Sequence, residues 1–380
     1  MVESTRIGCS ILQESKALVS DLKGQIDQLD LALVVVFCSV SYDLPEIARE
    51  LERAFPKVVV VGCTTAGEIG PNGYSRHSVS AISFSATDFS VSVELYKDLH
   101  DFPLGRWRTN TSSLHSRHNS LYQLKSDSKT FGLLLVDGMS IREEPLVRVV
   151  ASAIPQIPLI GGSAGDDLNF EQTYIFYQGK LWSDAALLIL ITTALPFQLF
   201  KTQHFVASDQ RMVVTAAIPE HRIVTEINGL PAGPEYARLL GLEGMEQLSP
   251  MVFAAHPVVV KMGDAEYVRS IQKVNTDGSL TFFCAIDVGV VLRTAQGVDI
   301  VTNLKQMLEH VHHQVGPPQA LITCDCILRR LELEQHGLLS PVSELLTNNN
   351  GVGFSTYGEQ INGVHVNQTC TGIAIGSHEH

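Results

Sequence analysis

The chain has 380 residues, 45% of them hydrophobic and 18% charged, so it can bury a large core and is longer than one ordinary domain needs. Its formal net charge of −13 argues against nucleic acid or an anionic membrane as a partner, because those partners need clustered Lys and Arg. The sequence has no apolar run near the roughly 18 residues that span a bilayer, no secretory signal and no regular cysteine spacing, which together predict a cytoplasmic protein.

The first part of the chain predicts a helix followed by a strand–helix–strand unit. Spaced apolar residues over 11–29 are typical of an amphipathic helix. The unit has a strand at 31–37, a helix near 45–56 and a second strand that ends in a turn at Gly67-Glu68. Alternating apolar and polar residues over 79–97 then predict a half-buried antiparallel hairpin.

The middle of the chain repeats the unit after a polar, serine-rich segment at 109–129 that predicts a loop and a solvated helix. The second copy starts at 131 and closes at Gly165-Asp166. A mainly β region follows over 174–207, and the Pro and Asn-Gly punctuation near 218–233 suits a transition between lobes.

The last part of the chain predicts an antiparallel set over 256–295, with Asp277-Gly278 as a hairpin turn. A helix at 300–316 leads into the third copy, which closes at Gly358-Glu359. Three recurrences of strand, helix, strand and Gly-acid turn indicate internal repetition. We therefore expect an α/β fold of two related lobes, each with mixed sheets, βαβ units and antiparallel extensions, divided into domains at 1–220 and 221–380.

The Gly-acid turns are the first candidate site, because open α/β sheets bind ligands beyond the carboxyl ends of their strands. Small residues there, such as Thr64 and Thr65, let a ligand approach the backbone. In the alternative interpretation the glycines serve the turns and the acids cap the next element. Descent from one repeated unit predicts that the first and third turns meet, with Glu68 and Glu359 buried and hydrogen-bonded to backbone N–H groups.

Motifs for catalysis are missing from the sequence: it has no G-x-S-x-G elbow, no phosphate-binding P-loop and no H-E-x-x-H. Cys324-x-Cys326 has the wrong spacing for a zinc ribbon and lacks a second pair. The absence of C-x-x-C-H excludes covalent haem attachment by that route. We therefore expect a protein that is not an enzyme.

Histidines offer the remaining chemistry, and those in strands or at strand starts are His204, His256 and His365. The alternative interpretation, for each of them, is a purely structural role. His256 is the strongest candidate for a metal ligand, because Pro257 favours an extended conformation at His256 and the flanking residues are apolar. A neutral imidazole in a dry pocket can hold a haem iron.

Three segments, GCTTAGEI, GGSAGDDLNFEQTYIF and STYGEQINGVHVNQT, together resemble the FIST sensory domains over about residues 30–376. The phrases DCILRRLE and YGEQINGVHVNQT are similar to the NosP group of that family. This resemblance implies a cytoplasmic, non-catalytic sensor that binds haem b non-covalently, senses nitric oxide and regulates a partner histidine kinase in biofilm control.

Two functions therefore compete. In the first, haem on His256, with His204 and His365 as the next candidates, senses nitric oxide or haem itself, and the changed contact between the lobes is transmitted to the kinase. In the second, a FIST module binds a small organic ligand such as an amino acid near the Gly-acid turns. Neither function requires nucleic acid or membrane, and both are compatible with a homo-oligomer.

Overall fold

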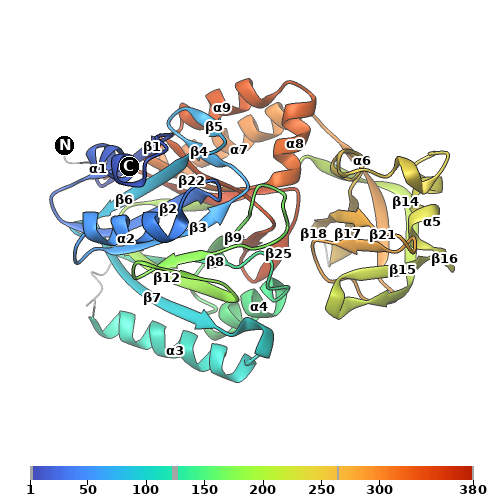
Figure 1. Ribbon diagram of the computed structural model, residues 1–380, viewed down its shortest axis with the longest axis horizontal. Coiled ribbons are helices and arrows are strands. Elements are labelled where there is room, and N and C mark those ends of the chain that lie inside the picture. Colours follow the sequence, from blue (N-terminus) through green and yellow to red (C-terminus); the bar gives the residue numbers. More distant parts are fainter. Residues whose placement is uncertain (1–2, 122–126, 263–264, 379–380) are drawn as a thin grey trace.

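The computed structural model describes residues 3–121, 127–262 and 265–378. These residues form two lobes (Figure 1). The larger one, called the core lobe, contains residues 3–203 and 299–378. The smaller one, called the inserted lobe, contains residues 205–297 and is entered after β13 and left before α7.

The core lobe consists of three repeats with one basic order of elements: strand, helix, strand, helix, strand, hairpin, strand; in the third repeat two helices stand in place of the second one. The first repeat contains β1 (Thr5–Ser10), α1 (Ser15–Ile26), β2 (Leu31–Ser39), α2 (Leu44–Ala54), β3 (Val59–Thr65), β4 (Glu68–Gly70), β5 (Gly73–Ser75) and β6 (Val79–Ser85). The second contains β7 (Phe89–Lys97), α3 (Leu104–Leu121), β8 (Lys129–Val136), α4 (Glu143–Ala153), β9 (Leu159–Ser163), β10 (Ile175–Tyr177), β11 (Lys180–Trp182) and β12 (Ala185–Thr193). The third contains β13 (Phe197–Thr202), α7 (Ile300–Val315), β22 (Ala320–Cys326), α8 (Ile327–Gln335), α9 (Leu339–Thr347), β23 (Gly351–Thr356), β24 (Glu359–Ile361), β25 (Val364–Val366) and β26 (Cys370–Ile375).

Hairpins are exchanged between the repeats in a ring. The described strands of the core lobe form three six-stranded sheets, in the orders β1-β6-β2-β3-β10-β11, β7-β12-β8-β9-β24-β25 and β13-β26-β22-β23-β4-β5. Each sheet is completed by a hairpin from another repeat: β10 pairs with β3, β24 with β9, and β4 with β23. No repeat therefore completes a sheet by itself.

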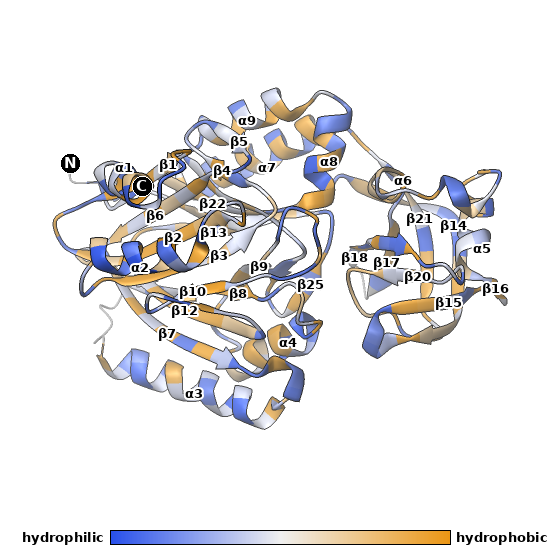
Figure 2. Cartoon of the chain, viewed as in Figure 1, coloured by the Kyte–Doolittle hydropathy of each residue, from blue (hydrophilic) through white to orange (hydrophobic). Residues whose placement is uncertain are grey.

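The middle strands of these sheets are apolar on both faces, as expected for strands covered on both sides. Leu33, Val35, Leu133 and Ile322 are fully buried in one shared core. In that core the Phe37 and Phe354 rings, from the first and third repeats, stack with their centroids 4.7 Å apart. Figure 2 shows the apolar residues on these strands and polar residues along the outer helices.

The inserted lobe is an antiparallel sheet with short helices. Its strands run in the order β18-β17-β21-β14-β15-β20-β19, with β16 paired to β15. The elements are β14 (Phe205–Ile218), β15 (Ile223–Ile227), β16 (Leu230–Pro231), α5 (Ala232–Leu239), α6 (Pro250–Ala255), β17 (Val258–Met262), β18 (Ala265–Arg269), β19 (Ile271–Val274), β20 (Leu280–Phe282) and β21 (Val291–Gly297). Gly278, with a φ of 82°, forms the predicted turn after Asp277.

The expected mixed α/β class and the two-lobed arrangement are confirmed. The repeated units lie differently from the sequence interpretation: all three pack within the core lobe, because the third copy resumes the core after the inserted lobe. Both ends of the described chain therefore belong to the core lobe (Figure 1). No helix in the described ranges is long and apolar enough to cross a membrane.

Candidate functional site

The three Gly-acid turns meet at the carboxyl ends of β3, β9 and β23. Backbone hydrogen bonds join each turn to the next: Ala66 N–H donates to the Ser355 carbonyl at 3.0 Å, Gly165 N–H to that of Thr64 at 3.0 Å, and Ser163 N–H to that of Gly358 at 2.8 Å. The predicted meeting of the first and third turns is confirmed, and the second turn joins them.

Glu68 and Glu359 occupy equivalent places in this cluster, and neither is exposed. Glu68 accepts hydrogen bonds from the Thr65 hydroxyl and from the backbone N–H and hydroxyl of Ser78. Glu359 accepts the same set from Thr356 and Thr369. Burial raises the pKa of Glu68 to about 7 and that of Glu359 to about 8, against the opposing effect of these hydrogen bonds. The predicted burial and backbone pairing of both acids is confirmed.

The second turn is built differently. Asp166 accepts hydrogen bonds from the Tyr357 hydroxyl and from the N–H groups of residues 170–172, so it organises the longer loop that precedes β10. Another buried carboxylate of the middle repeat, Asp137, follows β8 and accepts from the Thr173 hydroxyl, Met139 N–H and Asp184 N–H. The Gly-acid turns are thus mainly architectural, because their carboxylates are occupied by hydrogen bonds within the protein.

A cavity of about 80 Å³ lies beside the third turn, between the two lobes. The core lobe lines it with Gly138, Met139 and Ile141 from the segment before α4, and with Tyr357 from the turn. The inserted lobe lines it with His221 and Arg222 before β15, Gln272 of β19, and residues 281–283 at β20. We call this place the lobe junction.

The walls of the lobe junction include an aromatic cluster. The rings of Phe170 and Tyr357 stack at 4.8 Å between centroids, and Phe283 of the inserted lobe lies 6.0 Å from Phe170. The Tyr357 hydroxyl accepts from Leu168 N–H at 2.8 Å while it donates to Asp166. The ring that borders the cavity is therefore fixed by the loop after the second turn.

A buried ionic group crosses the lobe junction. The Arg222 Nη2 atom donates to Glu143 and to Glu144, both at 2.6 Å, and Glu144 also accepts from Ala285 N–H at 2.9 Å. Burial raises the pKa of Glu143 to about 6 despite the Arg222 charge. For Glu144, burial acts to raise the pKa, but the charge of Arg222 together with His365 and backbone hydrogen bonds outweighs it and lowers the pKa to about 2. The three side chains connect the N-terminus of α4 to the inserted lobe.

Several buried polar atoms near the junction have no hydrogen-bond partner among the described residues: Arg222 Nε, Gln360 Oε1, His365 Nε2 and both amide atoms of Asn367. A Cβ on Gly358, the neighbour of Tyr357, would lie 2.6 Å from His365 Nε2 and 3.3 Å from Asn367 Nδ2. Such groups are rare in proteins and often mark a place for water or a ligand.

The candidate histidines do not come together. His204 is fully buried at the crossing between the lobes, with Nε2 2.9 Å from the Glu332 carboxylate and Nδ1 2.9 Å from Arg329. His365, on β25, is buried at the junction, where burial lowers its pKa to about 4. The backbone of Phe283 lies close to the His365 ring, but the geometry does not make a hydrogen bond to Nε2.

His256 is exposed at the end of α6. The expected dry pocket around it is therefore wrong: Pro257 turns inward to start β17, and the imidazole points outward. His204 has both ring nitrogens engaged. Within the described chain, no group of three or more His, Cys, Asp or Glu residues could hold a metal ion. His256 and His204 are therefore not arranged to hold a buried haem, whereas the Nε2 atom of His365 is buried and has no partner in the described chain.

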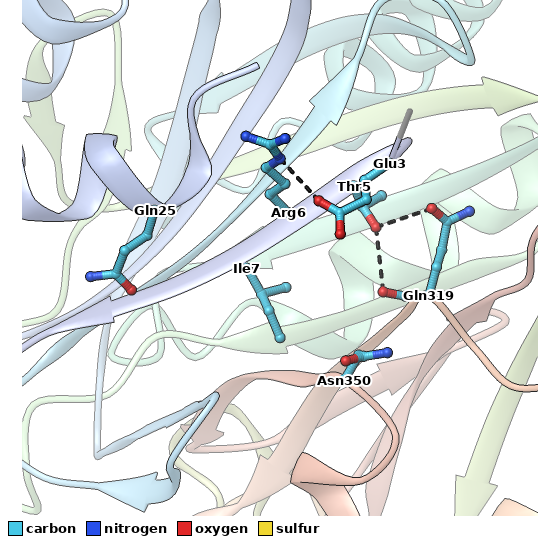
Figure 3. Close-up of a pocket in the computed structure, with 7 residues that line it drawn as sticks. All are labelled: Glu3, Thr5, Arg6, Ile7, Gln25, Gln319 and Asn350. Atoms are coloured by element: carbon cyan, nitrogen blue, oxygen red, sulfur yellow. Dashed lines mark hydrogen bonds and ion pairs between the residues drawn. The ribbon is translucent and has the colours of Figure 1, made fainter. Parts of the chain in front are cut away.

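A larger hollow of about 400 Å³ lies beside β1, lined by Glu3, Thr5, Arg6, Ile7, Gln25, Gln319 and Asn350 (Figure 3). Its charged side chains are well exposed, 43% for Arg6 and 68% for Glu3, and they pair with each other. The Thr5 hydroxyl is likewise directed to Gln319 (Figure 3). This hollow contains satisfied surface groups, so the lobe junction is the better candidate.

Neither Arg222 nor the acids of α4 stood out in the sequence. Two glutamates at a helix start are ordinary partners of the helix dipole. Asn367 was not singled out either, since its significance is the lack of a partner. The segment NGVHVNQT, which carries the family resemblance, was the available signal, because it contains both His365 and Asn367.

The fold is that of a two-lobed α/β module with polar groups buried where the lobes meet. Its sequence matches the FIST N domain over residues 32–230 and the FIST C domain over residues 232–362. The chain therefore belongs to the FIST family, whose domains are sensory domains of signal transduction. The two matches meet near residue 231, whereas the expected domain boundary was at 220.

A curated protein is similar to part of this chain. An uncharacterized protein of Methanocaldococcus jannaschii is 21% identical over 221 residues, which are 58% of this chain and 42% of the relative. The chain thus matches less than half the length of that relative.

Proposed function

We propose that this protein is a non-catalytic sensor that binds a small organic molecule at the lobe junction and reports its presence through a change in how the lobes meet. One observation carries the proposal: a cavity between the lobes is lined by Arg222, whose buried Nε atom has no acceptor in the described chain, and further buried polar atoms without partners lie near it. A buried donor or acceptor without a partner costs about 1–3 kcal/mol, and a ligand that supplies the partner recovers that energy.

The contacts across the junction explain how binding would be transmitted. Besides the Arg222 group, the Ser270 hydroxyl donates to Gln368 at 2.9 Å, and Arg269 donates to the His365 carbonyl at 3.0 Å. These contacts lie next to the buried polar atoms without partners. A ligand that binds those atoms therefore also changes the contact surface between the lobes. A ligand shifts such an equilibrium only by its difference in affinity for the two arrangements.

The output in this proposal is contact with a partner signalling protein. The NosP resemblance makes a sensor histidine kinase the expected partner, in the cytoplasm. An autophosphorylation assay with a sensor histidine kinase from the same genome would test it. A kinase whose activity does not change with the protein, in either its free or ligand-bound form, would contradict this output.

A cavity-filling substitution tests the binding site. We expect Met139→Trp to block small molecules that wild-type protein binds in a ligand-observed NMR screen. Met307→Trp, a partly buried methionine on α7 away from the junction, is the matched control and keeps the same binders. If every compound binds both variants equally, the junction is not the site.

Haem-based nitric oxide sensing is the second candidate, proposed from the NosP resemblance. Two structural features favour it: the imidazole of His256 is exposed and open to a ligand, and the buried Nε2 atom of His365 has no partner in the described chain. A Soret band in purified protein would support it, and His256→Ala would then remove the band while His310→Ala, an exposed histidine on α7, would not. An unchanged Soret band in His256→Ala would exclude His256 as the ligand of the haem iron.

A further inference from the structure

The lobe junction offers a strong hydrogen-bond donor that the protein leaves unused. Arg222 is only 7% exposed and lines the cavity. Its Nη2 atom serves both Glu143 and Glu144, but its buried Nε atom has no acceptor in the described chain. Guanidinium N–H groups bind carboxylates better than neutral acceptors because the hydrogen bond is charge-assisted.

The charges around the junction do not oppose a bound anion. Arg222 and Arg269 lie together with Glu143 and Glu144 around the buried thiol of Cys284. The two positive and two negative charges cancel. A bound ammonium group would instead need a free carboxylate, and both acids are already engaged by Arg222. The unused group is thus a donor, and it requires an acceptor.

The remaining walls limit the size and character of the ligand. A cavity of about 80 Å³ has room for about five water-sized groups, since one such group needs about 15 Å³. Met139, Phe283 and Tyr357 give part of its wall an apolar surface. An acid with a short alkyl chain fits both the size and the walls.

We infer that the ligand of the lobe junction is a small aliphatic monocarboxylate, whose carboxylate accepts from Arg222 Nε and whose alkyl chain packs on Phe283 and Tyr357. The inference rests on the proposed function and adds the class of ligand. It also explains the response: a carboxylate on Arg222 Nε shares the guanidinium charge with Glu143 and Glu144 on Nη2, so binding weakens the ionic contact between the lobes.

The test compares propionate with propionamide, which has nearly the same shape and no charge. We expect NMR titration of the full-length chain to show propionate binding about tenfold more tightly. Arg222→Lys retains the positive charge but lacks the Nε–H group, and it should reduce that preference to about twofold or less. Arg148→Lys, an exposed arginine on α4, is the matched control and should keep the preference.

The outcomes separate this inference from the proposed function. The carboxylate class is wrong if propionamide binds as tightly as propionate. It is also wrong if the compounds whose binding Met139→Trp abolishes are all neutral or cationic. In both cases the junction remains the binding site. If Met139→Trp abolishes the binding of no compound of any charge, both the carboxylate inference and the proposed binding site are wrong. Should Arg222→Lys fail to fold, the propionate-to-propionamide ratio in wild-type protein decides alone.

Discussion

The Gly-acid turns and the lobe junction bury polar groups in neighbouring parts of the molecule, but the two regions differ in how completely these groups are hydrogen-bonded. At the first and third turns, both carboxylates receive three hydrogen bonds each from hydroxyls and backbone N–H groups. At the junction, the Asn367 amide has no partner among the described residues. Full pairing makes the turns rigid and structural, whereas incomplete pairing leaves the junction able to bind a ligand.

Gly67→Ala should have the largest effect and would show how rigid the turn cluster is. A Cβ there would lie 1.5 Å from Arg330 Nη1, at a φ of 129° that side chains rarely adopt. We expect a loss of roughly 3 kcal/mol or more in the free energy of unfolding, measured by urea denaturation. Gly24→Ala, in α1 with open space around it, should instead stabilise the protein by up to about 1 kcal/mol.

Removing either buried carboxylate should have the next largest effect. Glu68→Ala or Glu359→Ala leaves two hydroxyls and one backbone N–H group without their acceptor, which should cost about 1–3 kcal/mol. Glu309→Ala, an exposed acid on α7, should change stability by less than about 0.5 kcal/mol in the same denaturation assay. Equal effects at the three sites would mean that the turns are not held by these acids.

The pH dependence of stability should reveal the same acids. The pKa values of Glu68 and Glu359 are raised to about 7 and about 8, so the folded state holds protons that the unfolded state releases near pH 4.5. Their contribution to stability is present below that pH and is lost as pH rises towards 8. The stability difference between pH 5 and pH 8 should therefore shrink in Glu68→Gln and Glu359→Gln relative to wild type. An unchanged difference would show that neither acid carries a proton in the folded state.

The smallest effect, and the sharpest contrast, comes from two adjacent residues. Asn367→Leu replaces an unpaired amide by an apolar group of similar shape. It should leave the free energy of unfolding, measured by urea denaturation, unchanged or raise it by up to about 1 kcal/mol. Gln368→Leu removes an amide that bonds both Ser270 and the Ala254 carbonyl, and should cost about 1–3 kcal/mol. Destabilisation by Asn367→Leu as large as that by Gln368→Leu would remove the distinction between the two regions.

Local patterns in the sequence predicted the repeated units well, because a strand, a helix and a Gly-acid turn are fixed by neighbouring residues. The repeat predicted that the first and third turns meet, but not that β4 pairs with β23 as a strand, since this pairing joins residues almost 300 positions apart and has no local signature. The site was harder still. His256 stood out by its neighbours but lies on the surface, whereas Arg222 and Asn367 matter through what surrounds them in space.

The ring of exchanged hairpins has a consequence for the synthesis of the chain. The hairpin β4–β5 is translated early, but its partner β23 emerges from the ribosome only after residues 351–356 have been made. Until then the β4–β5 hairpin lacks its partner strand, and exposed edges invite association with other chains. Because these contacts are so distant in sequence, we expect slow folding that is completed only late in translation and is exposed to aggregation until then.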